Sequence, residues 1–252
     1  MLIRVSFMVL SLVVLTSFES SLGSTFTKPA QDVDEPNTTA VVDGVEVKSD
    51  ESGVAPEQAT SSEQTAETAK LPQTISKFDS LMKRVGAETG YDWRFMSAIA
   101  YCESRFKEGL VSKRGAAGLM QVMPIVARHF KVPVSHIYNT ETNVRLACRL
   151  LNEFESMLRF PDNIAERDRL SIILASYNAG VGHVLDARRM ARVDGANPNS
   201  WAVVSKYLKL KADPAYYSRS EVKAGRFSGS KETLGFVSLA MSKYDEYCSI
   251  AW

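Results

Sequence analysis

The sequence holds few of the residues that build metal centres or disulfide frameworks. Only three Cys and three His occur among 252 residues, and their spacing does not match a zinc site. Cys102, Cys148 and Cys248 permit at most one disulfide, and each equally suits a small buried side chain in a helix. A phosphate-binding loop, a dinucleotide fingerprint and a serine nucleophile elbow are all missing from the sequence. We therefore expect no metal and no cofactor.

Long hydrophobic runs are also scarce. The one notable apolar run, residues 5–18, is too short to cross about 30 Å of hydrocarbon as a helix. Arg4 precedes it and small residues follow it, as in a secretory signal peptide. We expect residues 1–23 to be a signal peptide, with a short uncleaved membrane anchor as the alternative. Either would place the protein in the periplasm or the cell envelope.

An excess of charge of one sign is missing from the chain as a whole, which has 30 Lys and Arg against 29 Asp and Glu. This balance hides two segments of opposite sign. Residues 24–75 hold ten acids, three bases and one aromatic residue, so they bury too little apolar surface to offset chain entropy. We expect a disordered acidic linker there. Residues 76–252, with 26 bases and 18 acids, are long enough to build one core.

Helical periodicity dominates residues 76–252. Apolar residues recur at spacings of three and four, and no segment alternates as a strand would. Asp92, Asn143 and Asn197-Pro198 are candidate helix starts, and Asn178-Ala179-Gly180 is a candidate stop. The pattern predicts an all-α domain.

A carboxylate followed by two tight motifs stands out in this domain. Glu103 ends a mostly apolar helical segment, where the charged form of a carboxyl group is disfavoured and its pKa is raised. A raised pKa is what a general acid needs at neutral pH. The two motifs that follow are SKRGAAGLMQVMP, from Ser112 to Pro124, and ASYNAG, from Ala175 to Gly180. Glu103 alone would suit an ordinary surface position, so the order of the motifs carries the argument.

Together these residues resemble the signature of lytic transglycosylases of the goose-type lysozyme superfamily. That signature reads ES-R, then S-x-x-G-x-x-G-L-M-Q-x-x-P, then A-x-Y-N-x-G, and the resemblance covers nearly all of residues 76–252. It implies a lysozyme-like helical fold similar to soluble lytic transglycosylases. It also implies cleavage of the β-1,4 bond between N-acetylmuramic acid and N-acetylglucosamine in peptidoglycan without water, which leaves 1,6-anhydro ends.

The resemblance also implies roles for individual residues. Glu103 would be the single catalytic acid and base, whereas Glu108, the nearest other acid, suits a solvated loop charge. The positions implied to bind substrate are Ser104, Ser112, Gly118, Met120, Gln121, Tyr177, Asn178 and Tyr217. A purely structural role fits Ser104 and Gly118 equally well. Phe236 stands where the family usually has Tyr, so a hydroxyl that could touch substrate is lost.

Two other functions fit the same domain. One is a hydrolytic muramidase, although a hydrolase would benefit from a second carboxylate that activates water. The other is a non-catalytic protein that binds peptidoglycan in the envelope. Nucleic acid is not an expected partner, because the sequence has an export signal and no nucleic-acid-binding motif. The sequence leaves open the oligomeric state and whether cleavage is endo or exo.

Overall fold

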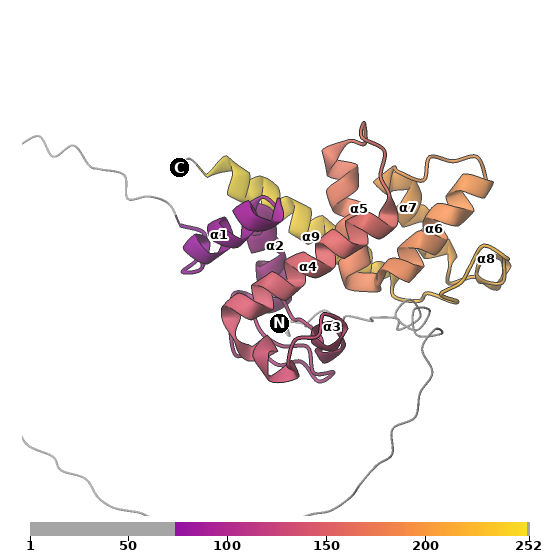
Figure 1. The fold of residues 1–252 in the computed structure, drawn as a ribbon. Coiled ribbons are helices and arrows are strands. Elements are labelled where there is room, and N and C mark those ends of the chain that lie inside the picture. The colour runs from indigo at the N-terminus through magenta and orange to yellow at the C-terminus, as the bar shows by residue number, and fades with distance from the viewer. Residues whose placement is uncertain (1–73, 251–252) are drawn as a thin grey trace, which may run out of the picture. The chain divides into compact units, whose positions relative to one another are not determined.

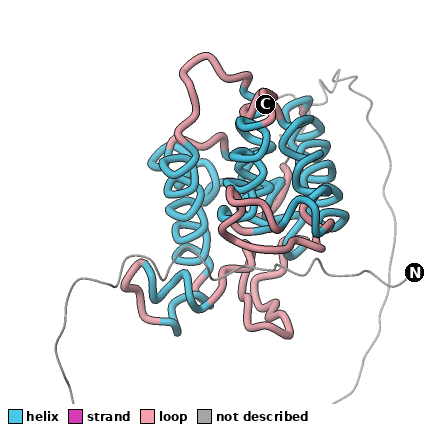
Figure 2. The backbone as a smooth tube through the Cα atoms, turned by 90° about the vertical axis from the view of Figure 1, so that its right-hand side faces the viewer, coloured by secondary structure: helices cyan, strands magenta, loops and turns pink. Residues whose placement is uncertain are grey.

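The computed structural model describes residues 74–250, and these residues form an all-helical domain (Figure 1). The predicted signal peptide or anchor, and the predicted linker up to residue 73, lie outside the described residues. The elements in chain order are α1 (Asp79–Thr89), α2 (Trp93–Ser104), α3 (Pro124–His129), the 3-10 helix η2 (Val134–Tyr138), α4 (Thr140–Leu158), α5 (Glu166–Ala179), α6 (Val181–Val193), α7 (Trp201–Leu210), α8 (Pro214–Tyr217) and α9 (Ser230–Ser249). Figure 2 shows helices and loops but no strand in this part of the chain, which confirms the predicted all-α class.

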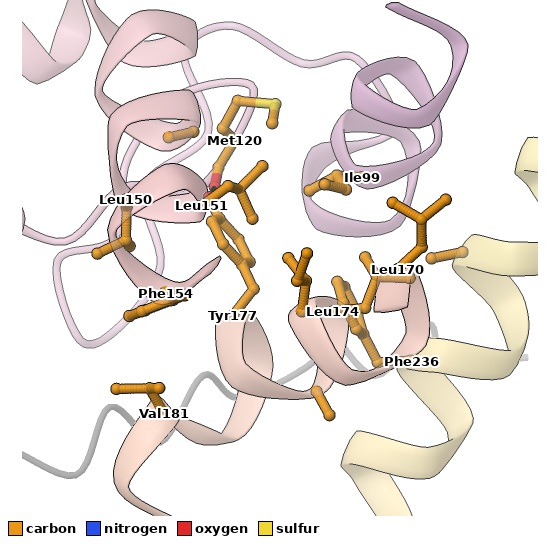
Figure 3. Close-up of a cluster of buried hydrophobic side chains, with 14 of the residues drawn as sticks. Ile99, Met120, Leu150, Leu151, Phe154, Leu170, Leu174, Tyr177, Val181 and Phe236 are labelled. Carbon is orange, nitrogen blue, oxygen red and sulfur yellow. Dashed lines mark hydrogen bonds between the residues drawn. The ribbon is translucent and has the colours of Figure 1, made fainter. Parts of the chain in front are cut away.

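Helix α5 forms the centre of the domain. It contacts α4, α6, α7 and α9, and every residue from 170 to 179 is buried. A helix surrounded by the core is expected to lack a charged face, and residues 170–179 include no charged residue. Figure 3 shows Leu170, Leu174 and Tyr177 of α5 between side chains of α2, α4 and α9. The core therefore surrounds the helix that carries the second sequence motif.

Several helix ends follow the sequence prediction, and two do not. Asp92 caps α2, because its side chain accepts a hydrogen bond from the N–H of Arg94 at 2.8 Å. The prediction that Asn143 caps a helix is wrong: Asn139 caps α4, accepting from Thr142 N at 2.9 Å, and Asn143 lies one turn inside the helix. The helix predicted to start at Asn197-Pro198 begins at Trp201, whose N–H donates to Asp168 of α5 at 2.8 Å.

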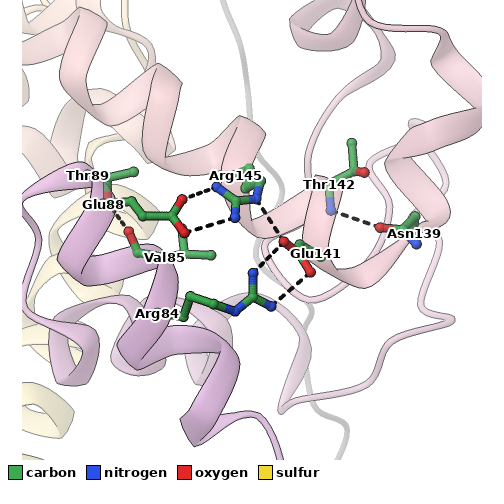
Figure 4. A network of polar contacts seen from close by, with 8 residues as sticks. All are labelled: Arg84, Val85, Glu88, Thr89, Asn139, Glu141, Thr142 and Arg145. Atoms are coloured by element: carbon green, nitrogen blue, oxygen red, sulfur yellow. Dashed lines mark hydrogen bonds and ion pairs between the residues drawn. The ribbon is translucent and has the colours of Figure 1, made fainter.

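An ion-pair network joins α1 to α4 (Figure 4). Arg84 forms two hydrogen bonds with Glu141, at 2.6 and 2.9 Å, and Arg145 pairs with both Glu88 and Glu141. The side chains are more than one-third exposed, so solvent screens each pair and its contribution to stability is small. Their combined effect is to fix α1 against the first turns of α4, close to the cap at Asn139.

The cysteines form no disulfide, and all three lie within the described residues. Cys148 is buried, Cys102 is half-buried and Cys248 is exposed. Within residues 74–250, none of the helices combines the length and apolar character needed to cross a membrane.

Candidate active site

Glu103 lies at the C-terminal end of α2 with its carboxyl group enclosed by the protein. The preceding residues 95–100 are all buried, and Glu103 itself is only 5% exposed. Its Oε1 atom has no hydrogen-bond partner among the described residues. Burial raises the pKa of Glu103 to about 8. The side chain is thus a carboxylic acid that stays largely protonated at neutral pH, as the sequence predicted.

The backbone turns sharply directly after this carboxyl group. Arg105 and Phe106 both have left-handed backbone conformations, with φ of 53° and 60°. Such conformations cost non-glycine residues about 1 kcal/mol each and persist where the surroundings hold them. Here the N–H of Arg105 donates to the carbonyl of Tyr101 at 3.0 Å, and its guanidinium lies over the Tyr101 ring, 3.9 Å from the centroid. The end of α2, and Glu103 with it, is fixed in place.

The first glycine motif forms a tightly bonded loop. Ser112 closes its first turn, because its N–H donates to the Ala116 carbonyl at 2.8 Å and its Oγ accepts from Ala116 N at 3.0 Å. Ala117 and Val122 exchange two backbone hydrogen bonds further along. The N–H of Gly118 donates to the Leu110 carbonyl at 2.9 Å. We call residues 110–123 the glycine loop.

Gln121 stabilises the glycine loop from within. It is buried and adopts a left-handed conformation with φ of 47°. Its side-chain Nε2 donates to the carbonyls of Leu110 and Gly118, each at 3.0 Å. The amide nitrogen is therefore used to shape the loop.

Asn143 of α4 is a site residue that the sequence reasoning missed. Its Oδ1 accepts from the N–H of Met120 at 2.9 Å, and its Nδ2 donates to the carbonyls of Ala117 at 2.7 Å and Ile137 at 2.9 Å. It is fully buried. The available signal was the presence of Asn139 four residues earlier, because a second Asn inside the helix is a poor helix former that needs another reason.

Gly118 is required by its contact with Asn143. Its φ is +76°, and a Cβ atom there would lie 2.6 Å from Nδ2 of Asn143. Side chains rarely adopt this φ, and real Cβ contacts are not this short. The glycine therefore allows the loop to approach α4 closely enough for the Asn143 hydrogen bonds.

The second motif meets the glycine loop through Tyr177. Its hydroxyl donates to the Met120 carbonyl at 2.6 Å, and Figure 3 shows its ring pointing toward Met120. Burial, and then the charge of Glu103, raise the pKa of Tyr177. The next residue, Asn178, accepts a hydrogen bond from Thr233 of α9 at 2.8 Å. The motif thus joins the loop, α5 and α9 near Glu103.

The structure joins five of the eight predicted binding residues and leaves the others apart. The hydrogen bonds above connect Ser112, Gly118, Met120, Gln121 and Tyr177 into one assembly. Ser104 is buried on α2 and its Oγ donates to the Ala100 carbonyl at 3.1 Å. Tyr217 is half-buried on α8, well separated from α2 in Figure 1, so it is not brought to Glu103. Most of the expected binding positions are buried: Ser104, Gly118, Met120, Gln121, Tyr177 and Asn178.

Two further predicted features have clear positions. Phe236 is buried on α9, and Figure 3 places its ring near Leu170 and Leu174, so it packs in the core. Glu108 pairs with Lys77 and accepts a hydrogen bond from Thr140 Oγ1 at 2.8 Å, with 41% of its side chain exposed. It is a surface charge, as predicted.

Part of this chain is similar to known proteins. Residues 80–198 match the family model of the transglycosylase SLT domain. The membrane-bound lytic murein transglycosylase F of Marinobacter nauticus is 34% identical over 146 residues, which is 58% of this chain and 28% of the relative. The protein of the same name from Vibrio parahaemolyticus is 38% identical over 150 residues, 60% of this chain and 27% of the relative. The chain thus matches less than a third of the length of these curated relatives.

Among solved structures, an inactive mutant of the lytic transglycosylase Slt from Pseudomonas aeruginosa aligns with a TM-score of 0.43 and 22% identity. The alignment covers 68% of this chain and 24% of that one. The family model spans the carboxyl group, the glycine loop and the Tyr177 motif, the same features that the geometry brings together. Residues 80–198 of this chain are therefore similar to the transglycosylase SLT domain in the region that contains Glu103, the glycine loop and Tyr177.

Proposed function

We propose that this protein is a lytic transglycosylase that cleaves the β-1,4 bond between N-acetylmuramic acid and N-acetylglucosamine in peptidoglycan. Cleavage occurs without water and leaves 1,6-anhydro-N-acetylmuramic acid ends, as part of cell-wall remodelling and turnover. The observation that carries this proposal is the isolated, buried carboxyl group of Glu103, whose pKa of about 8 suits an acid at neutral pH.

Glu103 performs both proton transfers in the proposed reaction. It first donates its proton to the glycosidic oxygen, which lets the leaving sugar depart as an alcohol. The resulting carboxylate then accepts the proton of the C6 hydroxyl as that oxygen attacks C1 and closes the anhydro ring. The unpartnered Oε1 atom has no hydrogen bond within the described protein that must break first.

The cause of the raised pKa of Glu103 favours this reaction over hydrolysis. Burial raises this pKa, and among residues 74–250 no neighbouring acid contributes to the shift. Glu108 is held at the surface by Lys77. A hydrolase that activates water uses a second carboxyl group within several ångströms of the first. A single carboxyl group that recycles its proton fits this site better.

We infer that some of the remaining predicted residues support the site and that others contact the sugar. The buried side chains of Gln121 and Tyr177 fix the glycine loop. We infer that backbone groups of this loop and the half-buried Ser112 contact the sugar. Ser104 donates to the Ala100 carbonyl within α2, and Asn178 accepts from Thr233, which joins α5 to α9. Tyr217 lies on the separate α8, where its ring is available to stack on a sugar at another point along a long glycan strand.

The test is digestion of purified peptidoglycan followed by mass spectrometry of the products. Wild-type protein is expected to release anhydro-muropeptides, and Glu103→Gln is expected to release none. Glu108→Gln is the matched control and should behave as wild type. Products with ordinary reducing ends would identify a muramidase instead. Binding to the wall without any product would identify a non-catalytic protein.

We also propose that residues 1–23 direct export, so that the SLT domain meets peptidoglycan in the periplasm or envelope. Fractionation of cells that produce the full chain, with N-terminal sequencing of the recovered protein, separates the two forms of this proposal. A new N-terminus near residue 24 in the soluble fraction indicates cleavage. An intact N-terminus in the membrane fraction indicates an anchor, and protein confined to the cytoplasm contradicts export.

A further inference from the structure

A cationic cavity lies between the last turn of α4 and one face of α6. It has a volume of about 550 Å³, and its lining includes four arginines, Arg159, Arg188, Arg189 and Arg192, beside the apolar side chains of Met157 and Leu185. Among residues 74–250 no acidic residue lines it, and it shares no residue with the candidate active site. This volume falls within the range of about 300–1,000 Å³ that is common for small-ligand sites.

Arg188 supplies a buried positive charge to the wall of this cavity. It is 3% exposed and donates to the carbonyls of Pro198 and Leu158 and to Oδ1 of Asn199. Burial, together with the charge of Arg192, lowers its pKa to about 10. All its partners are neutral oxygens, so within the described residues no carboxylate compensates its charge. A buried cation of this kind favours an anion nearby.

Arg159 and Arg192 are the exposed cations of the cavity. Among residues 74–250, neither side chain has an ion pair or a hydrogen bond. Arg189 differs, because it pairs with Asp186 and donates to the Glu221 carbonyl at 2.8 Å. The cavity thus presents two guanidinium groups with unused donors.

A second hollow lies beside the cationic cavity and, unlike it, is lined by acidic residues. It shares Ser156 and Arg159 with the cationic cavity but is also lined by Arg169 and by three acids, Glu155, Asp162 and Glu166. Arg169 pairs with both of those glutamates. Acids therefore outnumber bases on one side of Arg159, whereas arginines are the only charged residues described in the lining on the other side, where an anionic ligand would be drawn.

We propose that the cationic cavity binds the carboxylate-bearing peptide stems of peptidoglycan, at a point separate from the glycan cleavage site. This inference rests on the proposed function for the identity of the ligand. Guanidinium groups bind carboxylates through two parallel hydrogen bonds, and Arg159 and Arg192 supply such groups. The side chains of Met157 and Leu185 provide an apolar surface for the small aliphatic side chains of a short peptide. The protein would hold the wall at two places, which keeps it on the polymer between cleavages.

The test measures binding of a soluble disaccharide tetrapeptide by calorimetry, in a Glu103→Gln background so that the probe stays intact. Replacing Arg159 and Arg192 together by Gln is expected to weaken binding about tenfold or more. Amidating the carboxyl groups of the probe should cause a similar loss in the parent but less than about twofold in the double variant, because both changes remove the same contact. Equal losses from amidation in both proteins would overturn the proposal.

The matched control removes two exposed cations elsewhere, Lys206→Gln with Arg226→Gln, and should change affinity less than about twofold. A similar loss in this control would show general attraction and overturn the proposal. Inorganic phosphate should not displace the probe at equal concentration, and displacement would assign the cavity to phosphate. Circular dichroism checks that both double variants fold.

Activity assays separate failure of this inference from failure of the proposed function. On glycan strands stripped of peptide stems, the Arg159→Gln, Arg192→Gln variant with intact Glu103 is expected to release anhydro products as fast as wild type. On intact peptidoglycan its apparent affinity should fall. If wild type yields no anhydro product from either substrate, the proposed function fails. If wild type is active and the variant matches it on both substrates, only the cavity proposal fails.

Discussion

The hydroxyl of Tyr177 donates to the carbonyl of Met120 at 2.6 Å, while the N–H of the same Met120 donates to Asn143 at 2.9 Å. One peptide segment of the glycine loop is therefore held from α5 on one side and from α4 on the other. Tyr177 also lies close enough to Glu103 for the carboxylate charge to raise its pKa. The loop, α4 and α5 therefore form one hydrogen-bonded unit.

Tyr177→Phe removes one half of this support. It leaves the buried Met120 carbonyl without its partner, which is expected to lower the free energy of unfolding by about 1–3 kcal/mol. The rate of wall digestion should fall as well, because the loop beside Glu103 is held less firmly. Urea unfolding and product release measure the two effects. Tyr138→Phe, at a residue 57% exposed, should change neither. Loss of activity with unchanged stability would contradict a positioning role.

Gly118→Ala tests the close approach of the loop to α4. The new Cβ would lie 2.6 Å from Asn143 Nδ2, so the loop or the Asn143 hydrogen bonds must shift. Gly90→Ala is the matched control, since its φ of +81° is similar but nothing lies within 4 Å of the new Cβ. We expect Gly90→Ala to cost about 1–2 kcal/mol from the left-handed conformation alone.

Gly118→Ala is expected to cost at least about 2 kcal/mol more than this control, because it also disrupts buried hydrogen bonds, and to reduce activity sharply. Thermal unfolding and digestion assays on both variants provide the comparison. Equal destabilisation by the two substitutions would show that the Asn143 side chain can move away from the new Cβ atom without lowering stability, which would contradict the role assigned to its hydrogen bonds.

Local patterns in the sequence were sufficient to predict the helices and the state of Glu103. The apolar run before Glu103 predicted a raised pKa for its carboxyl group, and in the structure burial raises that pKa. The helix end predicted at Gly180 was also correct, because α5 ends at Ala179 and Gly180 follows it with φ of +91°. Such features depend on neighbouring residues, which periodicity and capping rules describe directly.

The support of the glycine loop could not be predicted, because it joins residues far apart in sequence. Asn143 was interpreted as a helix cap, since nothing local reveals that Met120, 23 residues earlier, lies against it. Tyr177 was expected to face the sugar, whereas it is fully buried and reaches a carbonyl 57 residues away. A motif shows which residues occur together, but packing decides which of them reach the surface.

The pH dependence of activity follows from the pKa of Glu103. Only the protonated acid can donate to the glycosidic oxygen, and burial raises its pKa to about 8. Activity is therefore expected to be retained through neutral pH and to fall as the pH rises through about 8. Initial rates of anhydro-product release between pH 5 and 10 test this, with Glu108→Gln as a control that keeps the same profile. A midpoint near 4.5 would indicate an exposed carboxylate instead.

The same burial predicts that Glu103→Gln stabilises the protein at neutral pH. The folded state binds the Glu103 proton with a pKa of about 8, and the unfolded chain with the ordinary value of 4.5. Between these values the folded state holds more protons, so wild type loses stability as the pH rises from 4.5 through about 8. Gln is neutral at every pH, so the variant does not lose stability at this position as the pH rises. Its advantage over wild type in the free energy of unfolding is expected to grow to the order of 3 kcal/mol by pH 7.

Urea unfolding at pH 4.5, 6 and 7 measures this difference. Glu108→Gln is the opposite case, because the ion pair with Lys77 lowers the pKa of the Glu108 carboxyl group. A lowered pKa contributes stability above the unfolded value, and replacing this residue should therefore remove a small amount of stability at pH 7. A Glu103→Gln advantage that stays constant across this pH range would mean that the carboxyl group is already ionised in the folded protein. That result would remove the acid on which the proposed reaction depends.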